Sequence, residues 1–183
     1  PLVAHLSQER FNFQLNFVRW ECDKLRAADV AEGTSDPFLK FTIVSTGKWK
    51  AADLLRRGAL NRRSTYTDKQ FNTLCPKYAP AKRPPYYYGT QPDLENETLR
   101  IEVWDWDRAS SNDLMGIAEV PMRGIVRSGY IQSAFGFPMK GDDKKEERME
   151  PAGKCEGYIE LPSTPMHSQF GDVVKRLRST TYL

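Results

Sequence analysis

Three aspartates lie within nine residues in the middle of the chain. Asp105 and Asp107 follow the run Leu99–Val103, in which apolar and charged residues alternate, and Asp113 comes after a polar turn. The alternation predicts a half-buried strand. Because Asp105 and Asp107 are two residues apart, their side chains point to the same side of an extended chain. Crowded carboxylates repel one another unless a cation lies between them, and this density of oxygen ligands favours Ca²⁺, which accepts roughly six to eight of them.

Three rival roles compete with a calcium site for this acidic stretch. Ordinary loop aspartates are one, because Asp is common wherever a chain turns. An EF-hand loop that began at Asp105 would end in a glutamate where this chain has Gly116, so that motif is excluded. A phosphorylated-aspartate pocket follows a fully apolar strand, whereas Arg100 and Glu102 make this strand one-sided.

A second acidic stretch lies near the start of the chain. Residues Phe11–Trp20 alternate between aromatic or aliphatic and polar types, which predicts another half-buried strand. Asp29 and Asp36 follow in the polar segment after it, and Asp36 stands in the run Gly33–Phe38. A second Asp-bearing loop favours a cation site over ordinary loop aspartates.

The two stretches together resemble the first and third calcium loops of a C2 domain, the phospholipid-binding β-sandwich of protein kinases C, synaptotagmins and ferlins. The resemblance covers residues of about 10–45 and 60–161. The segments that carry it are Asp29, Gly33–Phe38, Val103–Arg108 and Asp113–Gly116.

The resemblance implies a set of calcium ligands, namely Asp29, Asp36, Asp105, Asp107, Ser110 and Asp113. Two departures from the family pattern stand out. The interval from Asp29 to Asp36 is one residue longer than the usual family spacing, and Cys75 replaces the asparagine that commonly precedes Pro76. Neither departure removes a carboxylate.

The pattern predicts an all-β fold, an eight-stranded antiparallel β-sandwich with short helical insertions and a C-terminal last strand. We expect an N-terminal extension at residues 1–9, a C2-like domain at 10–162 and a basic tail or linker at 163–183. The predicted strands are 11–20, 38–44, 62–69, 85–90, 98–104, 115–122, 134–139 and 157–161, with helical pieces at 50–57 and 122–128.

Composition excludes several classes of protein. Hydrophobic residues make up 39% of the 183 residues and charged ones 28%, as is usual for globular domains. No apolar stretch is long enough for a transmembrane helix. The three cysteines have no metal-like spacing, so we expect unpaired packing thiols in a reducing cytosol. With two histidines near the termini and no nucleophile or phosphate-loop motif, we expect no enzyme.

The charge distribution suggests how the aspartates could control membrane binding. The net charge is +3, but without the five candidate aspartates the chain has 27 basic against 19 acidic residues, a formal +8. Each Lys or Arg near an anionic leaflet contributes roughly 1 kcal/mol, so Ca²⁺ that cancels the acidic patch would switch membrane binding on. We expect Ca²⁺-dependent binding to anionic phospholipid that targets a larger cytoplasmic host protein, in signalling or vesicle trafficking, to the membrane periphery. The alternative is a Ca²⁺-independent C2 scaffold that binds proteins or phosphoinositides; nucleic acid is not an expected partner.

Candidate lipid contacts fall into three groups. At the loop tips, Val30 and Ala109 are small, so we expect docking at headgroup level with Arg108 on phosphate, although a solvated loop charge accounts for Arg108 equally well. By family resemblance, Arg63 and Lys69 would share a strand face that binds phosphoinositides; a solvated face is the alternative.

The third group lies in a Pro-rich extension, residues 77–85, which contains Lys82 and Arg83. This extension either projects beside the calcium loops or folds back over the sandwich, where Tyr86–Tyr88 would pack as core. The sequence leaves these two arrangements open.

Overall fold

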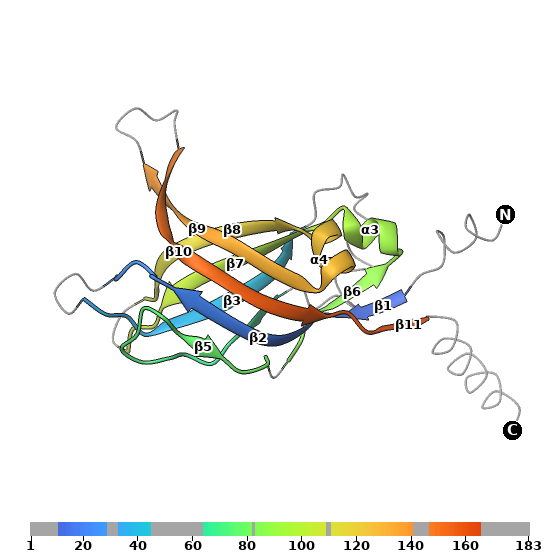
Figure 1. Cartoon of the computed structure of the whole chain (residues 1–183), viewed down its shortest axis with the longest axis horizontal. Helices are drawn as coiled ribbons and strands as arrows, with labels where there is room; N and C mark the ends of the chain where they lie inside the picture. Colours follow the sequence, from blue (N-terminus) through green and yellow to red (C-terminus); the bar gives the residue numbers. More distant parts are fainter. Residues whose placement is uncertain are drawn as a thin grey trace, which may run out of the picture.

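The structure is a computed structural model that describes residues 11–28, 33–44, 64–81, 83–108, 111–140 and 147–165. Burial alternates strictly along β3 (Pro37–Val44) and β7 (Thr98–Asp105), in which every second side chain faces the core. Antiparallel strands covered on one face produce this pattern. The predicted all-β antiparallel sandwich is therefore confirmed (Figure 1).

The main sheet has eight strands in the order β4-β3-β7-β8-β9-β10-β2-β5. A single residue pair, Ile117 opposite Gly136, joins β8 to β9. We infer that the sheet folds back on itself about this joint. Phe17 on β2 stacks on Phe41 on β3 at 4.0 Å between ring centroids, although β2 and β3 are not neighbours in the strand order. The remaining bounds are β2 (Asn16–Asp23), β4 (Ser64–Tyr66), β5 (Lys77–Tyr78), β8 (Asp113–Pro121), β9 (Tyr130–Lys140) and β10 (Glu147–Glu160).

A small second sheet lies near the chain ends, with β1 (Phe11–Gln14) between β6 (Tyr86–Gly89) and β11 (Ser163–Pro165). The predicted strand 11–20 is thus divided at Leu15, which is fully buried, and its two halves enter different sheets. Because β11 pairs with β1, the described fold extends past the boundary expected at residue 162.

Two short helices lie beside this small sheet (Figure 1). The helical turn predicted at 122–128 is confirmed as α4 (Met122–Ser128), which ends at Gly129 with a φ of 64°. The sequence did not predict α3 (Gln91–Glu95), which begins with a capping box between Thr90 and Asp93. The helix expected at 50–57 lies outside the described residues. No helix in the described part of the chain is long and apolar enough to cross a membrane.

Candidate calcium and membrane site

Three strand ends bring three of the predicted ligands into a row. Pro37 at the start of β3 lies opposite Asp105 at the end of β7, and Asp105 lies opposite Asp113 at the start of β8. Asp36 directly precedes β3, so it comes beside Asp105. We call this end of the sandwich the loop end, and it points to the left in Figure 1. The described residues of the first (24–28 and 33–36), second (67–76) and third (106–108 and 111–112) loops meet there.

Hydrogen bonds tie the first loop to the third. The backbone N–H of Asp36 donates to Oδ1 of Asp105 at 2.6 Å, and the N–H of Trp106 donates to the Asp36 carbonyl at 3.1 Å. Asp105 is only 3% exposed, which is unusual for a carboxylate at a strand end. Within the third loop, the N–H of Asp107 donates to Oδ1 of Asn112 at 3.2 Å. Asp105 is therefore the residue through which the two acidic loops are joined.

The second loop is fastened to the first by backbone donors. The N–H of Asn72 donates to Oδ1 of Asp36 at 2.8 Å, and the N–H of Thr73 donates to the Ser35 carbonyl at 2.9 Å. Asn72 has a φ of 51°, a left-handed conformation that asparagine tolerates better than most residues. All three loops thus contact Asp36 or its neighbours.

The donor chemistry at the loop end suits a hard cation. In the described residues, none of the carboxylates of Asp36, Asp107 and Asp113 forms an ion pair with lysine or arginine. Carboxylate oxygens are the preferred ligands of Ca²⁺. The described residues alone do not include three acidic, Cys or His side chains close enough to hold a metal ion. The remaining predicted ligands, Asp29 and Ser110, lie outside the described residues.

An aromatic cluster at the loop end was not predicted from the sequence. Phe71 in the second loop is 59% exposed and meets Trp106 in the third loop edge to face, with ring centroids 6.2 Å apart. The Lys69 ammonium lies 2.9 Å from the Trp106 ring centroid and 5.3 Å from that of Phe71. A cation over an aromatic face is electrostatically favourable. A large apolar side chain between the polar Gln70 and Asn72 was the available sequence signal.

The predicted lipid contacts are only partly brought together. Arg108 is exposed in the third loop, beside the acidic row. Lys69 lies beyond β4 and packs on Trp106, so it is not on the strand face expected for it. Val30, Arg63, Lys82 and Ala109 lie outside the described residues.

The described part of the 77–85 extension folds back over the sandwich. Lys77 is in β5, paired with β2, and its ammonium lies 3.6 Å from Glu21. Tyr78 is buried and its hydroxyl donates to the Pro37 carbonyl at 3.0 Å. Tyr87 is also buried, with its hydroxyl 3.2 Å from Oε1 of Glu97. The described residues thus fold back as in the second of the two arrangements that the sequence left open, although only Tyr87 of Tyr86–Tyr88 is buried.

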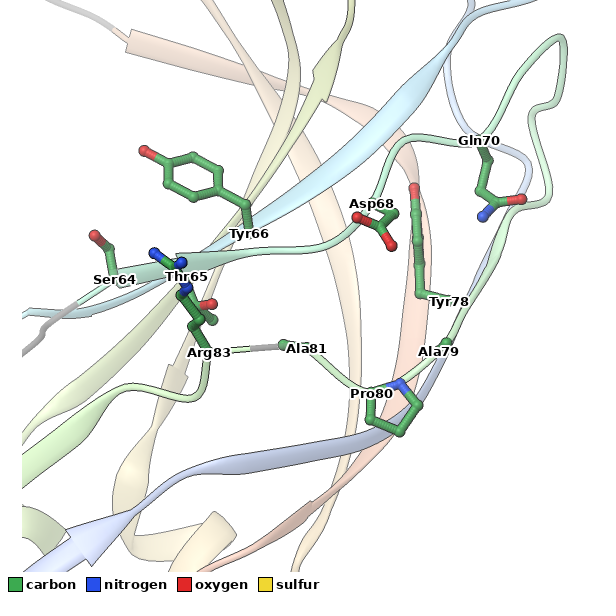
Figure 2. A pocket seen from close by; sticks show the side chains of 10 residues that line it. All are labelled: Ser64, Thr65, Tyr66, Asp68, Gln70, Tyr78, Ala79, Pro80, Ala81 and Arg83. Carbon is green, nitrogen blue, oxygen red and sulfur yellow. The ribbon is translucent and has the colours of Figure 1, made fainter.

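Arg83 lines a cavity of about 450 Å³ between the two edge strands of the main sheet. Figure 2 shows the Arg83 side chain beside Thr65 of β4, with Asp68 and Tyr78 farther along the same cavity. Arg83 therefore lies along the strands and not among the three loops. The extension does not place this arginine on the loop end.

The fold is an antiparallel β-sandwich with acidic loops at one end. The family model described as "C2 domain" matches residues 13–135, and the chain belongs to the C2 domain family. C2 domains bind membrane phospholipids, so the chain is in general terms a lipid-binding module.

Two curated relatives are similar in sequence to parts of this chain. The chain is 41% identical over 54 residues to "Protein kinase C, eye isozyme" of Drosophila melanogaster, which is 30% of this chain and 8% of the relative. It is 33% identical over 66 residues to "Tricalbin-1" of Saccharomyces cerevisiae, which is 36% of this chain and 5% of the relative. The match thus spans less than a tenth of either relative.

One solved structure supports the fold assignment. "Human GIVD cytosolic phospholipase A2" matches with a TM-score of 0.50 at 13% identity, over 85% of this chain and 17% of that chain. "BON1-C2B" matches with a TM-score of 0.48 at 16% identity, over 88% of this chain and 96% of that chain. The phospholipase likeness concerns the fold alone.

Proposed function

We propose that this C2 domain binds anionic phospholipid membranes in a Ca²⁺-dependent way, and that it recruits a larger host protein to the membrane without being catalytic itself. The observation that carries the proposal is the row formed by Asp36, Asp105 and Asp113 at adjoining strand ends. Like charges gathered at one end of a fold repel one another, and a bound cation relieves that repulsion. Unlike the acidic groups of Glu95, Glu102 and Glu119, those of Asp36 and Asp113 form no ion pair with a basic side chain in the described residues.

The first and third loops would hold the ions together. Asp36 and Asp105 are joined by a direct hydrogen bond, so both are suited to bridging positions, with Asp107 beside them. Asp29 and Asp113 would complete the coordination from either side. Bound Ca²⁺ supplies positive charge and open coordination positions that lipid phosphate can fill.

The overall charge supports a switch. The five candidate aspartates carry a formal −5 and the rest of the chain +8, so these aspartates oppose the attraction of the rest to an anionic surface. Arg108 is exposed next to the acidic row, where neutralised carboxylates would leave it free to contact lipid phosphate.

Phe71 and Trp106, the aromatic pair at the loop end, would add an apolar contact with the membrane to the electrostatic one. Phe71 is 59% exposed, and its neighbour Asn72 is hydrogen-bonded to the Asp36 carboxylate, so an apolar ring lies beside the acidic row. Burying an exposed Phe contributes roughly 1.5–3 kcal/mol. Trp106 favours the membrane interface because of its amphipathic ring. Lys69, held over Trp106, would lie at the level of the lipid phosphates.

Vesicle cosedimentation tests the proposal. The wild-type chain should pellet with phosphatidylserine vesicles in Ca²⁺ and stay in the supernatant with a chelator. Asp105→Asn should lose the Ca²⁺-dependent fraction, whereas Glu95→Gln in α3, at the opposite end of the sandwich (Figure 1), should keep it. Equal pelleting with and without Ca²⁺ would contradict the proposal.

A second candidate is Ca²⁺-independent binding of a phosphoinositide or a protein segment. The cavity that Arg83 lines between β4 and residues 78–81 favours it, because an anionic headgroup could meet the guanidinium there. Binding to phosphoinositide vesicles in chelator, lost in Arg83→Ala and kept in Asp105→Asn, would support this candidate against the first.

A further inference from the structure

Two of the three cysteines face each other across neighbouring strands. Cys22 on β2 lies directly opposite Cys155 on β10, in a register that runs without a shift from Asp23 opposite Lys154 to Arg19 opposite Tyr158. Both are buried, at 5% and 2% exposure. Residues directly opposite in a sheet share a face, so both thiols point into the core.

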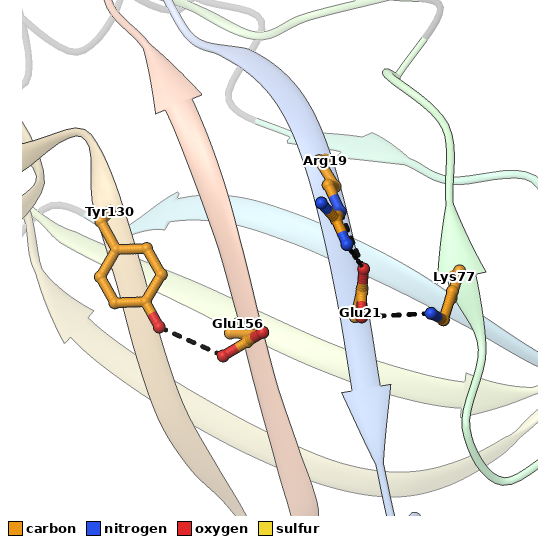
Figure 3. A network of polar contacts seen from close by, with 5 residues as sticks. All are labelled: Arg19, Glu21, Lys77, Tyr130 and Glu156. Atoms are coloured by element: carbon orange, nitrogen blue, oxygen red, sulfur yellow. Dashed lines mark hydrogen bonds and ion pairs between the residues drawn. The ribbon is translucent and has the colours of Figure 1, made fainter.

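The neighbouring pair shows the other face of the same strands. Glu21 lies opposite Glu156, one position before Cys22 and one after Cys155. In Figure 3 Glu21 reaches toward Lys77 on β5 and Glu156 accepts from the Tyr130 hydroxyl on β9. These polar contacts form on the side away from the core, so the cysteine pair is separated from them by the sheet itself.

The register meets the geometric requirement of a disulfide. Opposite residues in an antiparallel pair have Cα atoms about 4.5–5.5 Å apart. Disulfides span Cα separations of about 4.4–6.8 Å. The Cα separation typical of this register is therefore compatible with a disulfide between Cys22 and Cys155.

We propose that Cys22 and Cys155 are a redox-active thiol pair, which a small disulfide oxidant such as glutathione disulfide converts into a cross-strand disulfide. Each protein thiol gives up a proton and the pair gives up two electrons to the S–S bond of glutathione disulfide. The products are one protein disulfide and two glutathione thiols. The proposal does not depend on calcium or on lipid.

Burial makes the exchange slow but does not prevent it. Burial, and then the neighbouring Cys155 thiol, raise the pKa of Cys22 well above its usual range. Burial raises the pKa of Cys155 to about 12. Since the thiolate is the attacking species, reaction requires transient opening of the sheet or takes place as the chain folds. A bulge in the β9–β10 pairing between Pro151 and Lys154 ends next to Cys155, where such opening is easiest.

Cys75 provides an internal control. It is exposed, and its Sγ lies 3.5 Å from Oδ1 of Asp23, whose side chain is exposed and one position past Cys22. Cys75 therefore lies on the polar side of the sheet. An exposed thiol of this kind forms mixed disulfides with glutathione but has no opposing cysteine on its own side among the described residues.

A link between these strands has a mechanical consequence. β2 leads into the first loop at Asp23, so a disulfide at Cys22 would fasten the base of that loop to β10. It would also close a long loop, because 132 residues separate the two cysteines. Closing a long loop restricts the unfolded chain and stabilises the fold.

The experiment uses the whole chain, refolded from urea and separately incubated in its native state, in buffers of defined reduced and oxidised glutathione. After acid quenching and alkylation, tryptic peptides are analysed by mass spectrometry. The diagnostic species is Trp20–Lys24 joined to Cys155–Lys175; Gln70–Lys77 carries Cys75. Thermal unfolding is measured with and without dithiothreitol, on the wild type, Cys75→Ser and Cys155→Ala.

The linked peptide should form in the wild type and in Cys75→Ser and be absent in Cys155→Ala. Its formation should raise the unfolding midpoint by about 5–10 °C, a shift that dithiothreitol reverses. A link that lowers the midpoint, or refolding that yields only Cys75 adducts, would overturn the proposal. Because the peptide map reads the wild type and Cys75→Ser directly, poor folding of Cys155→Ala would not affect this result.

Discussion

The two ends of the sandwich differ in how the negative charges of their acidic residues are balanced. At the helical end Glu95 pairs with Arg123 at 3.7 Å, Asp93 caps α3, and the buried Glu97 accepts from the Tyr87 hydroxyl. At the loop end Asp36 and Asp113 form no ion pair with a basic side chain in the described residues. The charge of Glu95 is balanced by a basic side chain, whereas Asp36, within the described part of the chain, accepts only a backbone N–H, so its charge is better suited to bind a cation from outside.

The largest expected effect is at the loop end. Asp105→Asn and Asp107→Asn should each lower Ca²⁺ affinity by on the order of 100-fold or more, because ligand charge sets the affinity of such sites. Isothermal titration calorimetry measures this. Glu95→Gln at the helical end is the matched control and should titrate like the wild type. If Ca²⁺ affinity were unchanged in Asp105→Asn or Asp107→Asn, that aspartate would not be a Ca²⁺ ligand, and the loop end would not differ from the helical end in Ca²⁺ binding.

The next effect concerns the aromatic pair. Phe71→Ala should weaken binding to phosphatidylserine vesicles in saturating Ca²⁺ by roughly 10-fold, as expected when about 1.5 kcal/mol of apolar burial is lost. Tyr66→Ala is the control, since Tyr66 is similarly exposed, at 54%, but lies on β4. Vesicle titrations monitored by tryptophan fluorescence give both affinities.

Salt dependence sharpens this prediction. Electrostatic attraction weakens as added salt screens surface charge, so binding of the Phe71→Ala variant should fall more steeply with NaCl than that of the wild type. Parallel salt curves would mean that Phe71 does not enter the membrane interface and that docking is purely at headgroup level.

A smaller effect is expected at the helical end. Thr90→Ala removes the N-cap of α3 and should lower the free energy of unfolding by about 1 kcal/mol, measured by urea denaturation. Its Ca²⁺ affinity should equal that of the wild type, because α3 lies at the other end of the sandwich (Figure 1). Loss of Ca²⁺ binding in Thr90→Ala would show that the two ends are coupled.

The smallest effect should come from the extension. Arg83→Ala should change Ca²⁺-dependent vesicle binding by less than about twofold, because Arg83 lies on the cavity between the edge strands and not at the loop end. A tenfold loss of vesicle binding in cosedimentation would instead mean that the cavity lined by Arg83 is part of the membrane-docking surface.

Local patterns predicted elements that have one buried face. The alternation in β7 was readable because core and solvent impose a period of two on its side chains. The division of residues 11–20 at Leu15 could not be predicted from the sequence. The alternation of apolar and polar residues continues through Leu15, while the hydrogen-bonding partners change from β6 and β11 to β10 and β5. α3 was missed because five residues are too few for a helical period, and only its cap between Thr90 and Asp93 marks it.

For the candidate site, the sequence by itself determined the residue types and their spacing. It did not determine the side that Asp107 faces, because β7 ends at Asp105 and Asp107 lies in the third loop. Only the tertiary structure decided that Asp36 donates to Asp105, that Phe71 lies against Trp106, and that Cys22 faces Cys155. Each of these contacts joins residues at least 35 positions apart. Such pairs are set by strand order and register, which depend on packing of the whole sandwich and leave no local period in the sequence.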